Sequence, residues 1–418
     1  MALRLRKEKL MIIGAGKFQV PIIEQAKQMG FETIVVSIAG KYPGLLLADK
    51  SYHVDVREKD TILEIARKER IAGVVTDQTD WPVPTVAYVA ERMGLPGIGY
   101  ECALQITNKL KCREHCRKMG FPIPEFHKAT CLEEAREQAK DLRFPLIVKP
   151  VDSTAARGVA KVNHLSELPH KFQNAFECSA AGMVLLEEFF PGKKLELMGF
   201  TSNREFTNLL MAENEHFDLP DLFIIRQVLA PPLLEEDLKN RIFAFHTRLF
   251  QSFGAPFGIT FSDIKVNEET GEFRLIEAAL RGPGGFLSSH VSPLASGIDV
   301  VPALIEFATG KRKEFRIDKS KVLSRGAGNI YFYLPEGVVS RIKGMDEIKS
   351  MPGIHKVALD DLFPGRKIEP LRNLSGRQGP IVYAGEDREA CEEIIEKIKT
   401  VLQVEVQTPE GIRGMVWS

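Results

Sequence analysis

The sequence predicts an α/β fold, part of it α+β, built from several units. Buried strands alternate with amphipathic helices through residues 1–108, which is the order of a parallel sheet covered by helices. Two short strand-like runs within Phe257–Gly285 are joined by a polar turn, and each carries one acidic residue. The length of 418 residues corresponds to two to four units at about 100–200 residues each.

Composition excludes several classes of function. Lys and Arg number 56, as do Asp and Glu, so the net charge is zero and gives no support to nucleic-acid binding or to a polybasic membrane surface. No stretch reaches the ~18 apolar residues needed to span a bilayer. The apolar part of the basic N-terminal stretch is too short for a signal peptide and runs into a glycine turn. We therefore expect a cytoplasmic protein.

Six cysteines are scattered along the chain, and two of them, Cys112 and Cys116, flank His115. Their segment has a helical pattern, and no second Cys/His pair follows at zinc spacing. We expect reduced, structural thiols.

The N-terminal unit begins with a predicted strand, Leu10–Ile13, a turn at Gly14–Gly16 and a helix, Phe18–Met29. This order, repeated by the elements predicted next, indicates a Rossmann-like unit. Dinucleotide binding is disfavoured, because Gln19 stands where GxGxxG has its third glycine and the second strand ends at Ser37 rather than at an acid. The elements predicted next are strands 33–36 and 73–76 and helices 61–70 and 83–93.

Polar residues Asp77–Asp80 follow the strand at 73–76. Ligands bind at the carboxyl ends of strands in open α/β sheets, so this segment is either a substrate contact or a helix cap.

Lys149 ends a predicted buried strand, Phe144–Pro150. Burying an unpaired ammonium is costly, and a phosphate partner would explain its position. The small-residue loop Asp152–Gly158 follows, and its backbone N–H groups could approach an anion, although it is not a P-loop. Further predicted elements are helices 133–142, 166–177 and 233–253 and a strand, 183–192, that runs into a Pro-Gly turn.

The segment Phe257–Gly285 predicts a hairpin with its turn at Asn267–Gly271. A hairpin sets Asp263 and Glu277 on neighbouring strands. Two carboxylates facing one cleft suit Mg²⁺ that also binds phosphates. The alternative, a surface hairpin with solvated acids, is disfavoured because the flanking apolar runs bury the strands. Arg281 and four further residues, three of them glycines, follow.

The order of these motifs resembles the ATP-grasp superfamily of ligases. The motifs are Lys109, Lys149, the small-residue loop, Glu187-Glu188-Phe189 and the acidic hairpin with Arg281. The likeness covers nearly the whole chain and leans towards the branch of the L-amino-acid ligases and the carbamoyl-phosphate-synthase large chain. It implies four units: 1–108 Rossmann-like, 109–185 and 186–315 as small and large ATP-grasp subdomains, and 316–418 as an α+β lid, with a strand at 327–333 and a helix at 387–402.

The resemblance also implies site residues. Lys109 and Lys149 would contact the ATP phosphates, with Arg281 and Lys149 as catalytic residues. Asp263 and Glu277 would hold Mg²⁺, or alternatively Mn²⁺. The remaining nucleotide contacts would come from the phosphate loop (Ser153, Thr154, Arg157, Gly158), the adenine-binding hinge (Glu187, Glu188, Phe189, Phe190) and Glu196 at the ribose.

Three positions depart from the family pattern. Ala155-Ala156 replaces a Gly-Ser pair in the phosphate loop, and Lys194 stands where many relatives have an acid for the ribose. Ala279 replaces an asparagine metal ligand, which is similar to the L-amino-acid ligase branch.

The expected function is an ATP-dependent carboxylate–amine (or thiol) ligase that acts through an acyl phosphate and releases ADP and phosphate. Its partners would be ATP, a small carboxylate, an amine and a second copy in a homodimer. Two alternatives remain open: a purine-biosynthesis or carboxyphosphate-forming enzyme, and a non-catalytic ATP-binding regulatory protein, suggested by Ala279 and Lys194. Ser288–His290 could line the acceptor pocket, with His290 as a general base.

Overall fold

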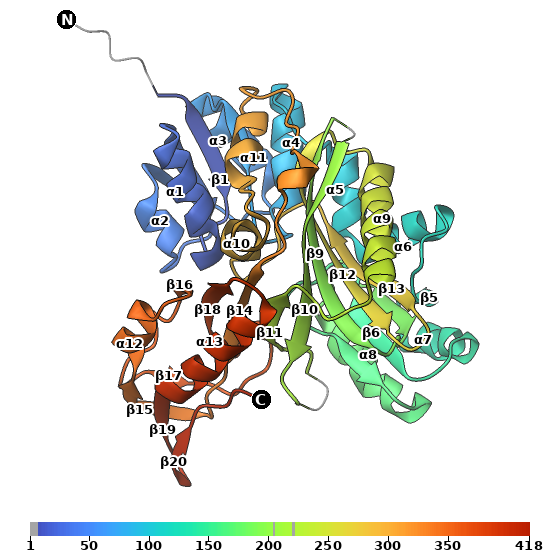
Figure 1. Ribbon diagram of the computed structural model, residues 1–418. Helices are drawn as coiled ribbons and strands as arrows, with labels where there is room; N and C mark the ends of the chain where they lie inside the picture. Colours follow the sequence, from blue (N-terminus) through green and yellow to red (C-terminus); the bar gives the residue numbers. More distant parts are fainter. Residues whose placement is uncertain (1–6, 204, 220–221) are drawn as a thin grey trace, which may run out of the picture.

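The computed structural model describes residues 7–203, 205–219 and 222–418, and in this part of the chain four β-sheets are surrounded by helices (Figure 1). The basic start, 1–6, lies outside the described residues. The N-terminal unit is a parallel sheet of order β3-β2-β1-β4, which confirms the predicted Rossmann-like arrangement. Its elements are β1 (Lys9–Ile13), α1 (Val20–Gln28), β2 (Glu32–Ser37), α2 (Pro43–Leu47), β3 (Lys50–His53), α3 (Lys59–Glu69), β4 (Gly73–Val75) and α4 (Val83–Met93).

Helices α5 (Tyr100–Thr107) and α6 (Lys109–Lys118) lead into a small antiparallel sheet of order β5-β8-β6-β7. Asn108 caps α6, because its side chain accepts a hydrogen bond from the Lys111 N–H at 3.0 Å. The cap fixes Lys109 at the first position of the helix. The sheet and its covering helices are β5 (Phe126–Ala129), α7 (Leu132–Gln138), β6 (Leu146–Pro150), β7 (Ala160–Val162), α8 (Leu168–Glu177) and β8 (Val184–Glu188).

The largest sheet has eight strands in the order β13-β12-β9-β10-β11-β14-β18-β16. Period-2 alternation gives its central strands two different faces. On β9 and β12, Leu195, Leu197, Ile264 and Val266 pack under the long helix α9, while the residues between them face a cavity. The elements here are β9 (Lys193–Ser202), β10 (Glu205–His216), β11 (Ile225–Ala230), α9 (Glu236–Phe253), β12 (Phe257–Asn267), β13 (Glu272–Ala279), α10 (Ser292–Ser296) and α11 (Val301–Ala308).

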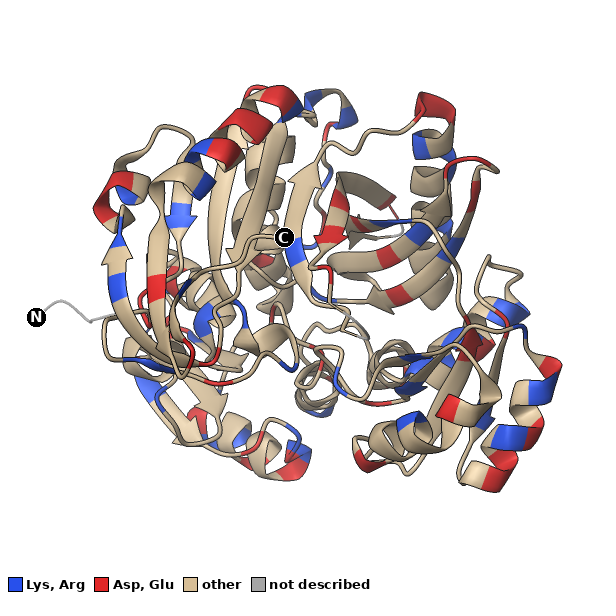
Figure 2. Ribbon diagram, turned by 90° about the horizontal axis from the view of Figure 1, so that it is seen from below, with Lys and Arg blue, Asp and Glu red and all other residues tan. Residues whose placement is uncertain are grey.

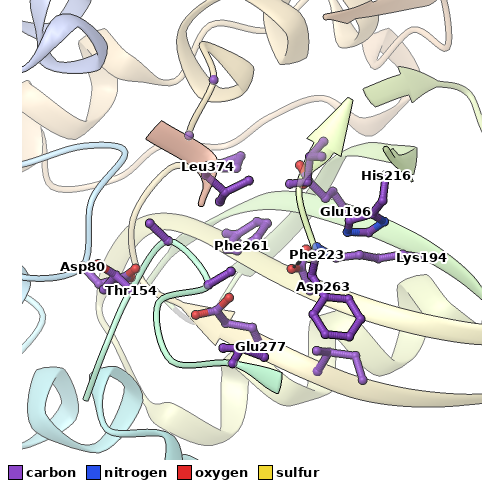
Figure 3. A pocket seen from close by; sticks show the side chains of 18 of the residues that line it. Asp80, Thr154, Lys194, Glu196, His216, Phe223, Phe261, Asp263, Glu277 and Leu374 are labelled. Atoms are coloured by element: carbon purple, nitrogen blue, oxygen red, sulfur yellow. Dashed lines mark ion pairs between the residues drawn. The ribbon is translucent and has the colours of Figure 1, made fainter. Parts of the chain in front are cut away.

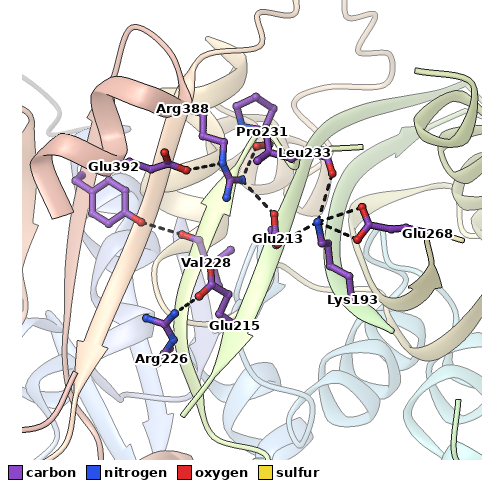
Figure 4. A network of polar contacts seen from close by, with 11 residues as sticks. Lys193, Glu213, Glu215, Arg226, Val228, Pro231, Leu233, Glu268, Arg388 and Glu392 are labelled. Atoms are coloured by element: carbon purple, nitrogen blue, oxygen red, sulfur yellow. Dashed lines mark hydrogen bonds and ion pairs between the residues drawn. The ribbon is translucent and has the colours of Figure 1, made fainter. Parts of the chain in front are cut away.

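The C-terminal region shares this sheet through β14, β16 and β18 and adds a second sheet of order β17-β15-β19-β20. A polar network fastens it to the central strands (Figure 4). Glu213 on β10 pairs with Lys193 at 3.3 Å and with Arg388 of α13 at 3.2 Å. The elements are β14 (Gly326–Phe332), β15 (Gly337–Lys343), α12 (Met345–Ser350), β16 (Ile354–Val357), β17 (Lys367–Ile368), β18 (Gln378–Gly385), α13 (Arg388–Val401), β19 (Gln403–Thr408) and β20 (Gly411–Gly414).

Several predicted elements differ in their ends. The helix predicted from Leu233 begins at Glu236, where Glu236 and Asp237 complement the helix dipole. The strand predicted over 183–192 is shorter in the structure, Val184–Glu188, and ends three residues before Pro191. No prediction was made for α5 or for β9–β11.

Charged positions of both signs are interspersed along the outer helices and strands, in keeping with the zero net charge (Figure 2). Among the described residues, no helix combines the length and the apolar character that crossing a membrane requires.

Candidate active site

A cavity of about 660 Å³ is lined by residues from each of the four predicted units, and Figure 3 shows part of its wall. The predicted residues that line it are Lys109, Lys149, Ser153, Thr154, Arg157, Glu187, Glu188, Phe189, Phe190, Glu196, Asp263, Glu277 and Arg281. The structure therefore brings together side chains that are widely separated in sequence. Gly158 is the exception. It turns the loop at φ +71°, and a Cβ there would lie 2.9 Å from Cys178 and Pro150 rather than facing the cavity.

The small-residue loop Asp152–Gly158, predicted to bind phosphate, lines part of the cavity. Lys109 Nζ donates to the Ser153 carbonyl at 2.5 Å and ties α6 to the loop. Ala155 and Ala156 both have φ of +58°, the left-handed conformation that side chains disfavour and that glycine adopts freely. Arg157 lies over the ring of Trp81 in the N-terminal unit, with its Cζ 4.6 Å from the ring centroid. The loop is thus held against two other parts of the chain.

Glu187 on β8 links two buried cations. Its carboxylate accepts from Arg113 Nε and from Lys149 Nζ, both at 2.6 Å. Burial alone would raise the pKa of Glu187, but the charges of Arg113 and Lys149 outweigh it and hold the pKa below its ordinary value. In this structure the Lys149 ammonium is thus neutralised by Glu187. The adenine contact expected of Glu187 stays a prediction.

Asp263 and Glu277 are directly opposite each other in the β12–β13 register, which confirms the predicted hairpin. Asp263 Oδ2 pairs with Lys194 Nζ at 2.8 Å, whereas Asp263 Oδ1 is buried and has no hydrogen-bond partner. A buried carboxylate oxygen without a partner costs free energy that a cation would relieve. The two carboxylates therefore fit a Mg²⁺ ion whose other ligands are phosphate or water oxygens.

The described residues contain no group of three or more His, Cys, Asp or Glu side chains that could hold a metal by themselves. Any ion at Asp263 and Glu277 would thus depend on oxygens brought by a ligand. All six cysteines are free thiols.

Glu196 lies two residues beyond Lys194 on β9 and accepts a hydrogen bond from Asn214 at 2.5 Å. Burial and the nearby charge of Asp263 raise the pKa of Glu196 to about 7. Lys194 and Glu196 lie near His216 on the same side of the cavity, away from Asp80 and Thr154 (Figure 3).

Arg281 is oriented by the N-terminal unit. Its Nε and Nη2 atoms donate to the two oxygens of Asp80 at 2.8 and 2.7 Å. Asp77 in turn accepts from the Gly282 N–H at 2.8 Å and from Ser288 Oγ at 2.7 Å. The segment Asp77–Asp80 was predicted to be either a substrate contact or a helix cap. In the structure, Asp77 and Asp80 hold Arg281 and the residues after it in place. A substrate contact stays a prediction.

The residues Ser288–His290 do not line the cavity. Ser288 faces Asp77, and His290 packs against Phe286 with its Nδ1 2.9 Å from Ser289 Oγ. Burial and the neighbouring Lys356 lower the pKa of His290 to about 4, so it is neutral at physiological pH.

We expect His290→Ala to leave the rate of ADP release within about twofold of the wild type between pH 6 and 9, since proton transfer by a positioned base contributes about 10²–10⁴-fold. Initial rates across this pH range are the measurement. A rate lowered by about 100-fold or more across this range would restore His290 as a base.

Motif reasoning missed several lining or linking residues: Arg113, His216, Lys265, Asn329, Tyr331 and Arg377. For Arg113 a signal was present, because it lies between Leu110 and Cys116 at helical spacing, on the buried face of α6.

Two family models match parts of the chain. Residues 107–218 match the phosphoribosylglycinamide synthetase ATP-grasp (A) domain, and residues 330–407 match the L-amino acid ligase C-terminal domain 2.

Among curated proteins, the chain is similar to formate-dependent phosphoribosylglycinamide formyltransferases. That of Methanocaldococcus jannaschii is 28% identical over 43% of this chain and 47% of its own length. That of Sulfurisphaera tokodaii is 23% identical over 83% of this chain and 86% of its own length. The chain thus spans about half the length of the first of these relatives and most of the second.

Solved structures share the fold. L-amino acid ligase from Bacillus licheniformis aligns with a TM-score of 0.82 at 22% identity, covering 96% of this chain and 100% of the other. The biotin carboxylase domain of Hydrogenobacter thermophilus 2-oxoglutarate carboxylase, solved with MgADP and bicarbonate, aligns with a TM-score of 0.75 at 16% identity, covering 97% and 91%. On these matches, residues 107–218 are similar to an ATP-grasp domain, residues 330–407 are similar to an L-amino acid ligase C-terminal domain, and the chain shares the fold of these solved structures.

Proposed function

We propose that this protein is an ADP-forming ligase that joins a carboxylate to an amine, or to a thiol, at the expense of ATP. The observation that carries the proposal is that one cavity brings the loop 152–158, Lys109 and Lys149 together with the acidic pair and Arg281. Phosphoryl transfer depends mainly on positioning and on charge stabilisation, and these residue types supply both.

In the proposed reaction, a substrate carboxylate oxygen attacks the γ-phosphorus of ATP, the bond to the β,γ-bridging oxygen breaks, and ADP leaves. The amine nitrogen then attacks the carbonyl carbon of the acyl phosphate. Inorganic phosphate departs, the nitrogen loses a proton, and an amide remains. Arg281 would bind the transferred phosphoryl oxygens through its planar set of donors, while Asp80 keeps the guanidinium in place.

Asp263 Oδ1 and the Glu277 carboxylate would hold Mg²⁺ together with phosphate oxygens. When bound, the ion would offset the negative charge of the phosphates. Lys109 and Lys149 would approach the phosphates from the other side. The loop 152–158 and the C-terminal region would exclude water from the acyl phosphate.

We further propose the division into units 1–108, 109–185, 186–315 and 316–418, a cytoplasmic location and a homodimer. The sheets support the division in outline, although β8 pairs with the second unit and β14 with the third. The relatives that act on phosphoribosyl compounds or bicarbonate make a purine-biosynthesis or carboxyphosphate-forming activity the nearest alternative.

A non-catalytic ATP-binding protein is the second candidate, and one observation favours it. The Lys194 ammonium forms an ion pair with one carboxylate oxygen of Asp263, the residue expected to bind Mg²⁺. Such a protein would bind MgATP but would not release ADP with any substrate pair.

The test is release of ADP and phosphate from MgATP in the presence of pooled amino acids, other carboxylates and bicarbonate. Release that requires both a carboxylate and an amine supports the ligase, and splitting the pools identifies the pair. Release with bicarbonate as the sole carboxylate favours the carboxyphosphate reaction. Calorimetric binding of MgATP without release from any pool favours the regulatory protein.

A further inference from the structure

Some of the Lys and Arg side chains that line the cavity form ion pairs with carboxylates, and others do not. Lys149 pairs with Glu187 at 2.6 Å, Lys194 with Asp263 at 2.8 Å and Arg281 with Asp80 at 2.7 Å. Arg377, just before β18, lines the same cavity and forms no ion pair with any described residue. The same holds for Lys17, Lys109, Arg157 and Lys265, but Arg377 alone among them stacks on Tyr331, whose hydroxyl is itself unpartnered among the described residues. Burial therefore lowers the pKa of Arg377, with Tyr331 and Glu196 opposing the shift only in part. Arg377 is half-buried and its guanidinium has no counterion among the described residues, so a bound anion would stabilise its charge.

Arg377 is nevertheless held in one orientation. Its Nη1 donates to the Ile225 carbonyl of β11 at 2.6 Å, and its Cζ lies 3.5 Å from the centroid of the Tyr331 ring. Stacking on the ring fixes the guanidinium plane. Its remaining N–H groups have no hydrogen-bond partner among the residues that the structure describes. A planar set of donors in this arrangement matches the two oxygens of a carboxylate or phosphate.

Two further polar atoms beside Arg377 lack partners. Tyr331 Oη and Asn329 Oδ1 are both buried without a hydrogen bond, and both side chains line the cavity. They lie two residues apart on β14, on the face opposite the apolar Ile330 and Phe332. Most buried polar atoms in folded proteins are satisfied, so two orphans beside an unpaired arginine point to a ligand.

The cluster of Arg377, Tyr331 and Asn329 lies near the segment that follows Arg281, but it does not include Arg281 itself. Asn329 Nδ2 donates to the Gly285 carbonyl at 2.7 Å, four residues after Arg281. A Cβ on Gly285 would lie 2.4 Å from Tyr331 Oη, so the cluster requires glycine there. The charges that act on Arg281 come from Asp80, Glu277 and Asp77, whereas those on Arg377 come from Tyr331 and Glu196. Arg377 is therefore placed to bind a different oxyanion from the one at Arg281.

We propose that Arg377, Tyr331 and Asn329 form a subsite for a second, non-reacting oxyanion on a substrate, either a carboxylate or a phosphate. The inference rests on the proposed function in that it assigns this group to one of the two substrates. Arg377 binds the oxyanion, Tyr331 Oη adds a hydrogen bond, and Asn329 Oδ1 accepts from a donor group on the same molecule. The substrate that occupies this subsite thus carries an acid group beyond the groups that form the new bond.

The subsite can be tested by binding, without turnover. Calorimetry on the full-length protein with MgADP would compare pooled pairs of compounds in three arms: amino acids with their amides, dicarboxylates with their monoamides, and phosphate monoesters with the parent alcohols. We expect the acidic member of at least one arm to bind about tenfold or more tightly than its neutral partner, the size typical of a charged hydrogen-bonding group. The arm that responds identifies the source of the oxyanion.

Arg377→Met should abolish that preference, Arg377→Lys should restore part of it, and Arg316→Gln, which changes an exposed arginine, should retain it. Tyr331→Phe removes a hydroxyl that has no partner, so it should fold normally and weaken binding of the acidic compound. Equal binding of acidic and neutral compounds in every arm, or an undiminished preference in both Arg377→Met and Tyr331→Phe, would overturn the proposal. Failure of ADP release with these preferences intact would count against the ligase activity alone.

Discussion

Glu277→Gln is expected to lower the rate of ADP release from MgATP by at least about 100-fold, the scale seen when one preorganised charge-stabilising group is removed. The side chain faces Asp263 across the hairpin and lines the cavity. Glutamine keeps the shape but removes the negative charge with which Glu277 would attract Mg²⁺. Glu277 takes part in no ion pair with the residues that the structure describes, so the variant should fold as the wild type does.

The decisive measurement is the affinity for ATP with and without Mg²⁺, because it does not depend on finding the substrates. Wild-type protein should bind ATP more tightly with Mg²⁺, and Glu277→Gln should lose most of that difference. Glu272→Gln is a matched control at the exposed start of β13, where Glu272 pairs with Arg274 at 3.6 Å. If the ATP affinity of Glu277→Gln depended on Mg²⁺ as much as that of the wild type, Asp263 and Glu277 would not be the Mg²⁺ ligands of bound ATP.

The hairpin could be predicted because its signals are local. Alternation, apolar flanks and a polar turn closed by glycine all lie within one stretch, and together they predict the two strands and their turn. The direct pairing of Asp263 with Glu277 also depends on a register shift between Asp263 and Ile264, which these signals do not reveal. Strands β1, β2 and β4 of the N-terminal sheet were predicted for the same reason, whereas β3, a short edge strand of polar residues, was not.

The partners of the charged residues could not be predicted in this way. Lys194 was recognised only as a departure at the ribose position, yet it pairs with Asp263, because β9 lies beside β12 in a sheet whose order does not follow the sequence. Arg377 and Tyr331 belong to no motif, and long-range packing of β18 against β14 brings them together. Side-chain alternation predicts the face of a strand but not the strand beside it.

Arg113 shows an intermediate case. Its helical spacing predicts burial, and a buried arginine requires an acidic partner, but the sequence does not say which one. The structure supplies Glu187, and with it a connection between α6, β6 and β8 at the wall of the cavity.

Glu187→Gln is expected to destabilise the protein by about 3–5 kcal/mol, the cost of leaving buried charges without their partner. Here two cations, Arg113 and Lys149, would lose the same carboxylate. Urea unfolding at pH 7 is the measurement. Glu188→Gln provides a control at the next residue, because Glu188 pairs with the exposed Arg143 and its loss should hardly move the unfolding midpoint.

The difference in unfolding free energy between wild type and Glu187→Gln, measured as a function of pH, distinguishes the effect of the lost charge from an effect on packing. The pKa of Glu187 is below its ordinary value of 4.5 in the folded protein, so its ionised form stabilises the fold. This contribution is complete above the unfolded-state pKa and is lost as the pH falls through the lower, folded-state pKa. The stability difference between wild type and Glu187→Gln should therefore be full from about pH 6 upwards and shrink below pH 4.5. A difference that stays constant down to pH 3 would mean that the glutamine disturbs packing rather than charge.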